Sequence, residues 1–461
     1  MDYDLVVIGG GAGGLGAARA GARRGARTLL VQRGPLGGDC TFTGCVPSKA
    51  LIEAAAGGAT FDDAVATVHR AVATIAAAED DDAVSREGIE VRHGWARLRS
   101  DGAVDVDGQA VRGRRIVLAT GAGPSVPPIA GLAEVAYLTN ETVFDLTELP
   151  PTLAVLGGGA IGCELAQAFA RLGSTVTVIE ALERLLPRED IDASRVVTKV
   201  FAEAGIGVRT GSRVVRVEAL ATRGAARLHL DDGDPVEAGA VLVAIGRTPA
   251  TAGMDLDAAG VEVDERGFVR VDGHLRTTAA GIYAVGDANG LSLFTHAADE
   301  MGRIAVNNAS RRFPQRRFRP ELIPRVTYTD PEVAHIGLTE ADAAARGGRV
   351  AFVPMAEVDR AIVTGRTEGF LKLIVGPRRL TRGLAGGRVL GATVVAPRAG
   401  EVLHEIALAM RAGLFPARLA LTVHAYPTWS TAVRQAAAQL FMDVNGRHAE
   451  PARTDGHLTA P

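Results

Sequence analysis

The chain has 461 residues, too many for one hydrophobic core, which predicts two to four domains. Its net charge of -3 gives no reason to expect nucleic acid or an anionic membrane surface as a partner. No apolar stretch reaches the roughly 20 residues of a membrane span, and the N-terminus enters a strand-like run without a secretion signal. Three cysteines make no structural disulfide framework, so we expect a cytoplasmic protein.

The first predicted elements are a buried strand over 5–8, a glycine cluster, an alanine-rich helix through Arg24, and a strand over 28–31. A strand, G-x-G-x-x-G, a helix and a strand in this order are typical of a dinucleotide-binding fold. The glycines let the backbone approach a pyrophosphate at the helix N-terminus. The three glycine positions are Gly9, Gly11 and Gly14. One such motif alone is a weak indication.

Two cysteines, Cys40 and Cys45, follow in a loop punctuated by glycine. Cys45 lies beside the start of a predicted helix, since Pro47 suits a first turn and 49–56 holds mostly helix formers. A helix N-terminus stabilises a thiolate. The pair predicts a dithiol/disulfide that is reduced through a bound flavin, and a pair of buried structural cysteines is the alternative.

The nucleotide-binding pattern occurs a second time, with a strand over 153–156, a helix to Arg171 and a strand over 175–179. The spacing agrees in the two copies, because the residues that end the second strands, Gln32 and Glu180, each lie 23 positions after the first glycine. Two copies favour two folds that bind two different dinucleotides. The glycines of the second copy are Gly157, Gly159 and Gly162.

Later apolar runs also end in glycine or an acid, as expected where a sheet edge meets a cofactor. One run ends at Thr120 and Gly121, another at Gly246, and a third at Asp287. Asp287 is a candidate acceptor for sugar or ribityl hydroxyls, or else a cap for the helix predicted from His296 onward.

The pattern of predicted strands and helices changes near Pro320. Strands over 325–328, 370–375 and 389–395 alternate with a helix over 400–412, which predicts a separate α+β domain. The polar segment 445–461 is predicted to be a disordered tail.

Taken together, these blocks resemble the flavoprotein pyridine nucleotide-disulfide oxidoreductases over residues 3–442. The resemblance is strengthened by Thr329-Asp330-Pro331-Glu332, which looks like the start of the family's dimerisation domain, and is nearest to the mercuric-reductase-like, dihydrolipoamide-dehydrogenase-like subgroup. It implies an α/β fold with two Rossmann-like domains, the NAD(P)H domain inserted in the FAD domain, then a C-terminal α+β dimerisation domain. The expected boundaries are 1–148 and 270–319 for FAD, 149–269 for NAD(P)H and 320–444 for the interface.

The resemblance also implies roles for individual residues. Electrons would pass from NADH through the flavin to the Cys40/Cys45 disulfide, with Cys45 proximal to the flavin and Cys40 attacking the substrate. Lys49 would lie near the flavin and pair with Glu164; an exposed helix lysine and a surface glutamate are the alternatives. FAD would be bound by Gly9, Gly11, Gly14, Gln32, Thr120, Gly121 and Asp287, and NAD by Gly157, Gly159, Gly162, Glu180 and Gly246. We expect a homodimer and no metal site.

The nucleotide preference follows from the end of the second strand in the inserted unit. Glu180 favours a ribose 2'-hydroxyl and repels a 2'-phosphate, so NADH is the expected donor, with NADPH possible. Arg184, four residues later, is a candidate for rescuing phosphate binding.

Three departures from the family pattern bear on the acceptor. Gln32 stands where an acidic residue usually binds the ribose, and it accepts through one oxygen only. Tyr426 stands in the place of the family's proton-donating histidine and is one candidate for the donor. His424 lies two residues earlier and is the other candidate, because residues two apart in an extended segment face the same way; a packed or solvent-facing histidine is the alternative. No cysteine follows Cys163, an expected core residue, which disfavours a mercuric-ion reductase. The acceptor is thus a disulfide, quinone or metal ion, and a redox sensor is the alternative outside enzymes.

Overall fold

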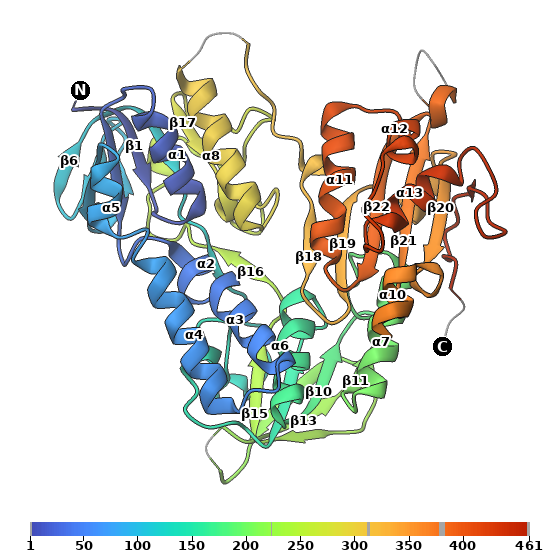
Figure 1. The fold of residues 1–461 in the computed structure, drawn as a ribbon. Helices are drawn as coiled ribbons and strands as arrows, with labels where there is room; N and C mark the ends of the chain where they lie inside the picture. The colour runs from blue at the N-terminus through green and yellow to red at the C-terminus, as the bar shows by residue number, and fades with distance from the viewer. Residues whose placement is uncertain (1, 223, 311–313, 378–382, 459–461) are drawn as a thin grey trace. The chain divides into compact units, whose positions relative to one another are not determined.

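The computed structural model describes residues 2–222, 224–310, 314–377 and 383–458. The chain folds into two compact units, whose elements are shown in Figure 1. Unit 1 comprises 1–127, 138–148 and 245–320, and unit 2 comprises 128–137, 149–244 and 321–461. None of the helices in the described ranges is long and apolar enough to cross a membrane.

Unit 1 is built on a five-stranded sheet in the order β17-β7-β1-β2-β3, whose neighbouring strands are all parallel. Such sheets are buried on both faces, which explains the continuous apolar runs of the first strands. Helix α1 packs against α8, as Figure 1 shows. The strands are β1 (Tyr3–Ile8), β2 (Thr28–Gln32), β3 (Ile89–His93), β7 (Gly113–Leu118) and β17 (Ile282–Ala284), and the helices α1 (Ala12–Ala22), α2 (Gly38–Phe42), α3 (Cys45–Ala56), α4 (Phe61–Ala76), α5 (Asp81–Arg86) and α8 (Thr295–Ser310).

Two smaller sheets complete unit 1. One is an antiparallel meander, β4 (Ala96–Leu98), β5 (Val104–Val106) and β6 (Gln109–Val111), and the other joins β8 (Ala122–Pro124) to β16 (Arg247–Pro249). The pairing of β16 with β8 brings the chain back into unit 1 at residue 245, earlier than the expected boundary at 270.

Unit 2 begins with a parallel sheet in the order β11-β10-β9-β15, followed along the chain by an antiparallel β12-β13-β14 sheet. A glycine-rich turn, a helix and a strand follow β9, as the repeat predicts. The elements are β9 (Thr152–Leu156), α6 (Ala160–Leu172), β10 (Thr175–Glu180), α7 (Ile191–Glu203), β11 (Gly207–Thr210), β12 (Val214–Ala219), β13 (Ala226–Leu230), β14 (Val236–Ala238) and β15 (Ala240–Val243).

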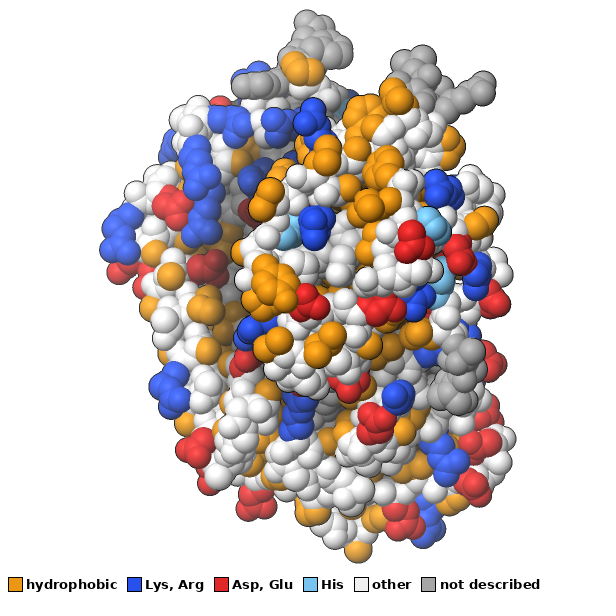
Figure 2. Space-filling view, turned by 45° about the vertical axis from the view of Figure 1, so that its right-hand side comes forward, with side chains coloured by type: hydrophobic (Ala, Val, Ile, Leu, Met, Phe, Trp, Pro, Cys, Tyr) orange, Lys and Arg blue, Asp and Glu red, His pale blue; other side chains and the backbone are white. Residues whose placement is uncertain are grey.

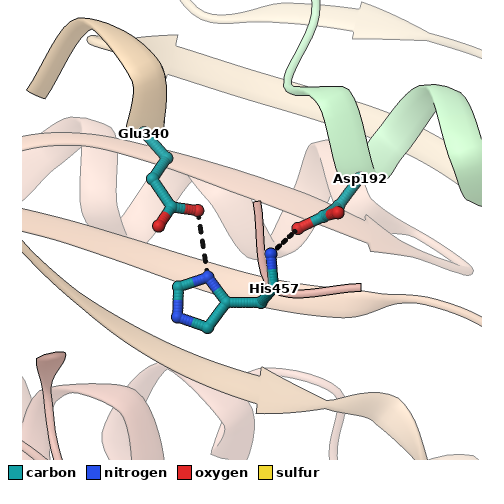
Figure 3. Close-up of side chains that lie close together, drawn as sticks. All are labelled: Asp192, Glu340 and His457. Carbon is teal, nitrogen blue, oxygen red and sulfur yellow. Dashed lines mark hydrogen bonds and ion pairs between the residues drawn. The ribbon is translucent and has the colours of Figure 1, made fainter. Parts of the chain in front are cut away.

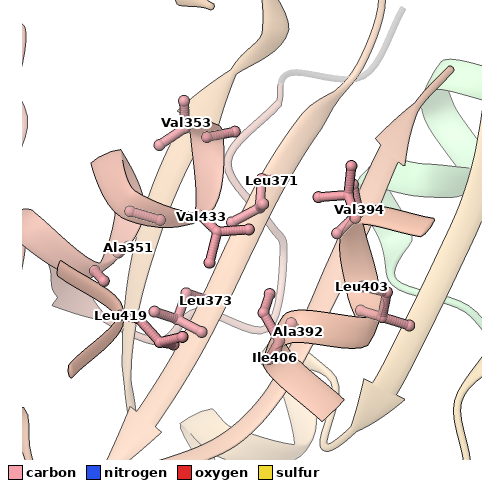
Figure 4. Packing of buried hydrophobic residues seen from close by; sticks show 14 of the residues in the cluster. Ala351, Val353, Leu371, Leu373, Ala392, Val394, Leu403, Ile406, Leu419 and Val433 are labelled. Carbon is pink, nitrogen blue, oxygen red and sulfur yellow. The ribbon is translucent and has the colours of Figure 1, made fainter. Parts of the chain in front are cut away.

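The rest of unit 2 is an antiparallel six-stranded sheet in the order β18-β19-β22-β21-β20-β23. One face buries its alternate side chains under α11 and α13, where Leu371 and Leu373 of β21 meet Ile406 and Val433 (Figure 4). The elements are β18 (Arg325–Thr327), β19 (Glu332–Gly337), α9 (Glu340–Ala344), β20 (Arg349–Pro354), α10 (Asp359–Thr364), β21 (Phe370–Gly376), β22 (Arg388–Ala396), α11 (Ala399–Ala412), α12 (Pro416–Leu421), α13 (Thr431–Ala438) and β23 (Glu450–Pro451).

The polar C-terminal segment differs from its prediction. The sequence predicts disorder from 445 onward, but β23 pairs antiparallel with β20 and the Ala452 N–H donates to the Gly348 carbonyl at 2.9 Å. Polar composition is a poor guide here because this segment adds to an existing sheet edge by backbone hydrogen bonds, which need few apolar side chains.

Candidate active site

The two cysteines lie on consecutive short elements of unit 1. Cys40 is in α2 and Cys45 is the first residue of α3, so its side chain sits at a helix N-terminus, where the dipole favours an anion. A hydrogen bond with Cys45 and burial together raise the pKa of the Cys40 thiol well above its usual range.

Thr295 is a member of this site that the sequence analysis missed. Its hydroxyl lies 3.3 Å from the Cys45 sulfur, and it is the first residue of α8. A threonine that begins a helix reads as an ordinary capping candidate. No local signal connects it with a cysteine 250 positions away.

An arginine links two carboxylates next to the dithiol. Arg247 lies 2.8 Å from an Asp39 oxygen and 3.1 Å from an Asp287 oxygen. Asp39 also accepts hydrogen bonds from the Thr43 hydroxyl at 2.6 Å and the Asn140 amide at 3.1 Å. Burial raises the pKa of Asp287 to about 6, although Arg247 works in the opposite direction. This cluster connects α2, which holds Cys40, to Asp287, the predicted FAD-binding residue.

The first glycine turn has the close packing that a bound pyrophosphate needs. A Cβ on Gly9 would lie 2.2 Å from the Ala119 carbonyl oxygen, and one on Gly14 would lie 1.8 Å from the Gly9 oxygen. Gly11 precedes α1, and no side chain caps that helix N-terminus. The Thr120 hydroxyl, two residues after β7, is buried without a hydrogen-bond partner among the described residues. Gly121 follows it with a φ of +75°. These features fit FAD, whose phosphates and hydroxyls would occupy the open donors and acceptors.

The second glycine turn repeats this packing in unit 2. Gly157 has a φ of +108°, and a Cβ on Gly162 would lie 1.9 Å from the Gly157 oxygen. Gly159, by contrast, has no atom within 4 Å of such a Cβ, which leaves room for a phosphate. Glu180 accepts hydrogen bonds from Gly158 N–H at 2.7 Å and Leu182 N–H at 2.8 Å, so its carboxylate is held at the end of β10.

Arg184 and Gly246, the other two residues considered for the pyridine nucleotide, make contacts with other parts of the protein. The Arg184 guanidinium donates to the carbonyls of Leu186 at 3.2 Å, Pro187 at 2.7 Å and Glu189 at 3.0 Å, so it is used within its own loop and not turned toward a 2'-phosphate. Gly246, expected with the NAD residues, belongs to unit 1, where its carbonyl accepts from the Ser125 N–H at 2.9 Å.

Lys49 and Glu164 belong to different units. Lys49 lies in α3, one turn after Cys45, and its ammonium donates to the Ser48 hydroxyl at 3.3 Å. Glu164 is buried in α6 and accepts a hydrogen bond from the Tyr328 N–H at 2.8 Å. The pairing of Lys49 with Glu164 stays a prediction.

The two candidates for the proton donor are in different surroundings. The His424 side chain is only 5% exposed, with Nε2 2.9 Å from a Glu405 oxygen and Nδ1 3.0 Å from the Thr422 carbonyl oxygen. Both ring nitrogens are therefore occupied by acceptors of the same chain. Tyr426 is 75% exposed, and a hydrogen bond with Asp359 raises the pKa of its hydroxyl. Cys163 is buried, as expected, and its thiol donates to the Gly158 carbonyl at 3.3 Å.

Fold and site together define a flavoprotein oxidoreductase with paired cysteines. Residues 3–302 match the pyridine nucleotide-disulphide oxidoreductase family and residues 323–437 match its dimerisation domain. The chain belongs to this family, whose members use FAD and NAD(P)H.

Named relatives span nearly the whole chain. It is 37% identical to a dihydrolipoyl dehydrogenase of Chlorobaculum tepidum, with 94% of this chain and 96% of the relative covered. It is 34% identical to a mercuric reductase of Bacillus cereus, with 96% of this chain and 72% of the relative covered. Among solved structures, the Cu(II) complex of the HOCl-induced flavoprotein disulfide reductase RclA from Escherichia coli matches with a TM-score of 0.86 at 29% identity, covering 95% of this chain and 100% of that one.

Proposed function

We propose that this protein transfers two electrons from NADH, by way of FAD, to the Cys45/Cys40 pair and then to an external acceptor. Bound FAD would accept the electron pair as a hydride equivalent and pass it to the disulfide. With a disulfide acceptor, NADH, one proton and the disulfide give NAD⁺ and two thiols. The observation that carries the proposal is the hydrogen-bonded Cys40/Cys45 pair, with Cys45 at the start of α3, in the unit that holds the FAD turn.

Each residue of the pair has its own task in this proposal. Cys45, anchored by the Thr295 hydroxyl at 3.3 Å, carries the thiolate that faces the flavin. Cys40 keeps its proton in the reduced pair, and it becomes the nucleophile once it passes that proton to the Cys45 thiolate. Asp39, immediately before it, is held by Arg247 and Asn140, which fixes the orientation of α2.

A metal ion or quinone is the second candidate acceptor, and the proton-donor region favours it. Cleavage of a substrate disulfide needs an acid for the leaving thiol, whereas reduction of a metal ion does not. Both ring nitrogens of His424 are already bonded to Glu405 and Thr422, and the raised pKa of Tyr426 makes it a weak acid. One relative is named mercuric reductase, and one similar structure is a Cu(II) complex of RclA. Both are compatible with a metal ion as the acceptor.

We also propose that the protein acts as a homodimer through the domain that begins near residue 320. Large hydrophobic side chains of this domain are exposed in the single chain, and hydrophobic side chains gather on the face shown in Figure 2. The most exposed are in the range from 64% to 94% and include Leu384, Leu408, Leu421, Val423 and Tyr426. Patches of this kind mark association surfaces.

An anaerobic acceptor screen tests the proposal. The FAD-loaded protein is given NADH with lipoamide, glutathione disulfide, a quinone, Hg(II) or Cu(II), and NADH oxidation is followed beside a Cys40→Ser variant. Sustained oxidation that needs Cys40 identifies the acceptor class. Quinone turnover that survives in the variant is a side reaction of the flavin. A single stoichiometric reduction followed by arrest, with every acceptor, would mean a redox sensor instead of an enzyme.

A further inference from the structure

A charged cluster is buried in unit 2, far along the chain from the cysteines. Lys372 of β21 is 0% exposed, and its ammonium lies 2.8 Å from Asp190, 2.7 Å from Asp192 and 2.6 Å from Glu340. Burial alone would lower the pKa of Lys372, but the three carboxylates outweigh it and raise that pKa, so the ammonium stays charged. Asp192, Glu340 and His457 are close enough to share a cation, and Lys372 supplies one.

The chain from 450 to 458, which we call the C-terminal segment, docks on this cluster (Figure 3). The N–H groups of His457 and Leu458 donate to the two oxygens of Asp192 at 2.7 Å and 3.1 Å. The His457 ring nitrogen Nδ1 lies 3.0 Å from Glu340, and the ring stacks on Phe352 with centroids 4.9 Å apart. Asp192 is completely buried, so this contact is shielded from water.

Asp192 is also connected to the nucleotide turn of unit 2. It lies in the first turn of α7, whose N-cap is Asp190, directly after the loop 181–190. Arg184 of this loop donates to the Ser194 hydroxyl on α7, and the Leu186 N–H donates to the Gly158 carbonyl at 2.8 Å. The loop therefore spans from the glycine turn and Glu180 to the helix that holds the C-terminal segment.

We propose that docking of the C-terminal segment on Asp192 positions the loop 181–190 for the adenosine half of the pyridine nucleotide, so that docking and nucleotide binding strengthen each other. This inference rests on the proposed function, because it takes the turn at Gly157 and Glu180 as the nucleotide site. A docked segment restrains the start of α7, so less ordering of the loop is left for the nucleotide to impose. Linkage requires the effect to be equal in both directions.

Gly456 offers a sharp variant with a matched control. Its φ is +79°, and a Cβ there would lie 2.6 Å and 2.7 Å from the oxygens of Asp192, so Gly456→Ala displaces the segment from the cluster. Gly446 has a similar φ of +75° with nothing within 4 Å of a Cβ. Gly446→Ala therefore imposes the same backbone strain without the collision.

The test is the dissociation constant of NAD⁺ from the FAD-loaded oxidised protein, measured by calorimetry, with NADP⁺ titrated in parallel. We expect Gly456→Ala to weaken NAD⁺ binding about fivefold or more, the usual lower range of coupling between sites. Gly446→Ala should bind as the unaltered protein does. The KM for NADH should rise in Gly456→Ala while kcat with a quinone acceptor stays the same, because the flavin and cysteines are untouched.

The reciprocal test uses the unaltered protein, so it does not depend on the folding of a variant. Saturating NAD⁺ should slow tryptic cleavage after Arg453 by the same factor, measured by mass spectrometry, and a chain ended after Pro451 should bind NAD⁺ as weakly as Gly456→Ala. Equal binding by Gly456→Ala and the unaltered protein, equal weakening in both glycine variants, or cleavage indifferent to NAD⁺ would each overturn the linkage. Failure of the unaltered protein to bind either nucleotide would overturn the nucleotide site of the proposed function as well.

Discussion

Gln32 and Glu180 hold matching positions in the two nucleotide-binding turns. Each ends the second strand of its unit, and each accepts a hydrogen bond from the second glycine of its turn, Gly10 at 2.8 Å and Gly158 at 2.7 Å. They differ in the second polar atom of the side chain, which is an amide nitrogen in Gln32 and a carboxylate oxygen in Glu180. The Gln32 amide donates to the Pro35 carbonyl at 3.0 Å, whereas the second Glu180 oxygen accepts from the Leu182 N–H.

Gln32→Glu should tighten FAD binding. A carboxylate accepts ribose hydroxyls through charged hydrogen bonds, while the variant loses the bond to Pro35, so the net gain is about 1 kcal/mol or roughly fivefold in affinity. Flavin release on dialysis against salt measures this, and thermal unfolding of the flavin-free protein should show a slightly lower Tm than that of the unaltered chain. Unchanged or weaker retention would mean that the adenosine end is held by other groups.

Glu180→Ala should narrow a preference for NADH over NADPH, because the carboxylate that repels a 2'-phosphate is removed. Arg184→Ala is the informative companion, since its guanidinium is bonded to carbonyls of its own loop and to the Ser194 hydroxyl of α7. The ratio of kcat/KM for the two nucleotides should change in Glu180→Ala and stay constant in Arg184→Ala. A fall in the ratio of NADPH to NADH kcat/KM in Arg184→Ala would show that this arginine does reach the phosphate.

The two cysteines should respond differently to substitution. Two-electron reduction of the FAD-loaded protein should produce long-wavelength absorbance from the Cys45 thiolate beside the flavin, so Cys45→Ser should abolish it and Cys40→Ser should keep it. Both variants should lose disulfide reduction. The opposite spectral pattern would exchange the roles of the two sulfurs.

Asp287 should make the flavin-free protein less stable as the pH rises from about 4 to about 6. Burial raises the pKa of Asp287 to about 6, so the unfolded state loses its proton first and is favoured across that window. A shift of about two units corresponds to roughly 3 kcal/mol. Denaturant unfolding at several pH values, compared with Asp287→Asn, isolates this contribution. A constant difference in unfolding free energy between the two proteins from pH 4 to 6 would contradict the prediction.

His424→Gln and Tyr426→Phe should each slow reoxidation of the reduced protein by less than about tenfold. Loss of a general acid costs on the order of 100-fold to 10,000-fold. We expect neither residue to act as one, because both ring nitrogens of His424 already face acceptors and the raised pKa of Tyr426 makes its hydroxyl a weak acid. Stopped-flow mixing of the reduced protein with each acceptor measures reoxidation, and flavin reduction by NADH is the internal control. A hundredfold loss with a disulfide in His424→Gln alone would restore the histidine as proton donor.

Much of the site is visible in the sequence because its signals are local. The glycines of both turns, Cys45 at the start of a helix and Glu180 at the end of a strand depend on neighbours within one supersecondary unit. The domain class follows from the order of these units. The contacts of Arg247 with Asp39 and of Thr295 with Cys45 join residues more than 200 positions apart, and no spacing rule connects them.

The C-terminal segment is an example of what only the tertiary structure decides. Two nucleotide turns, a redox pair and an interface domain can be inferred from the residues alone, since turn geometry and hydrophobic period are properties of short stretches. The folded chain is needed to see that Asp190, Asp192 and Glu340 surround the Lys372 ammonium, and that His457 hydrogen-bonds to Asp192 and Glu340. From its composition alone, a polar segment is expected to be exposed to water. Whether buried charged groups are available to hydrogen-bond with it is decided by the fold.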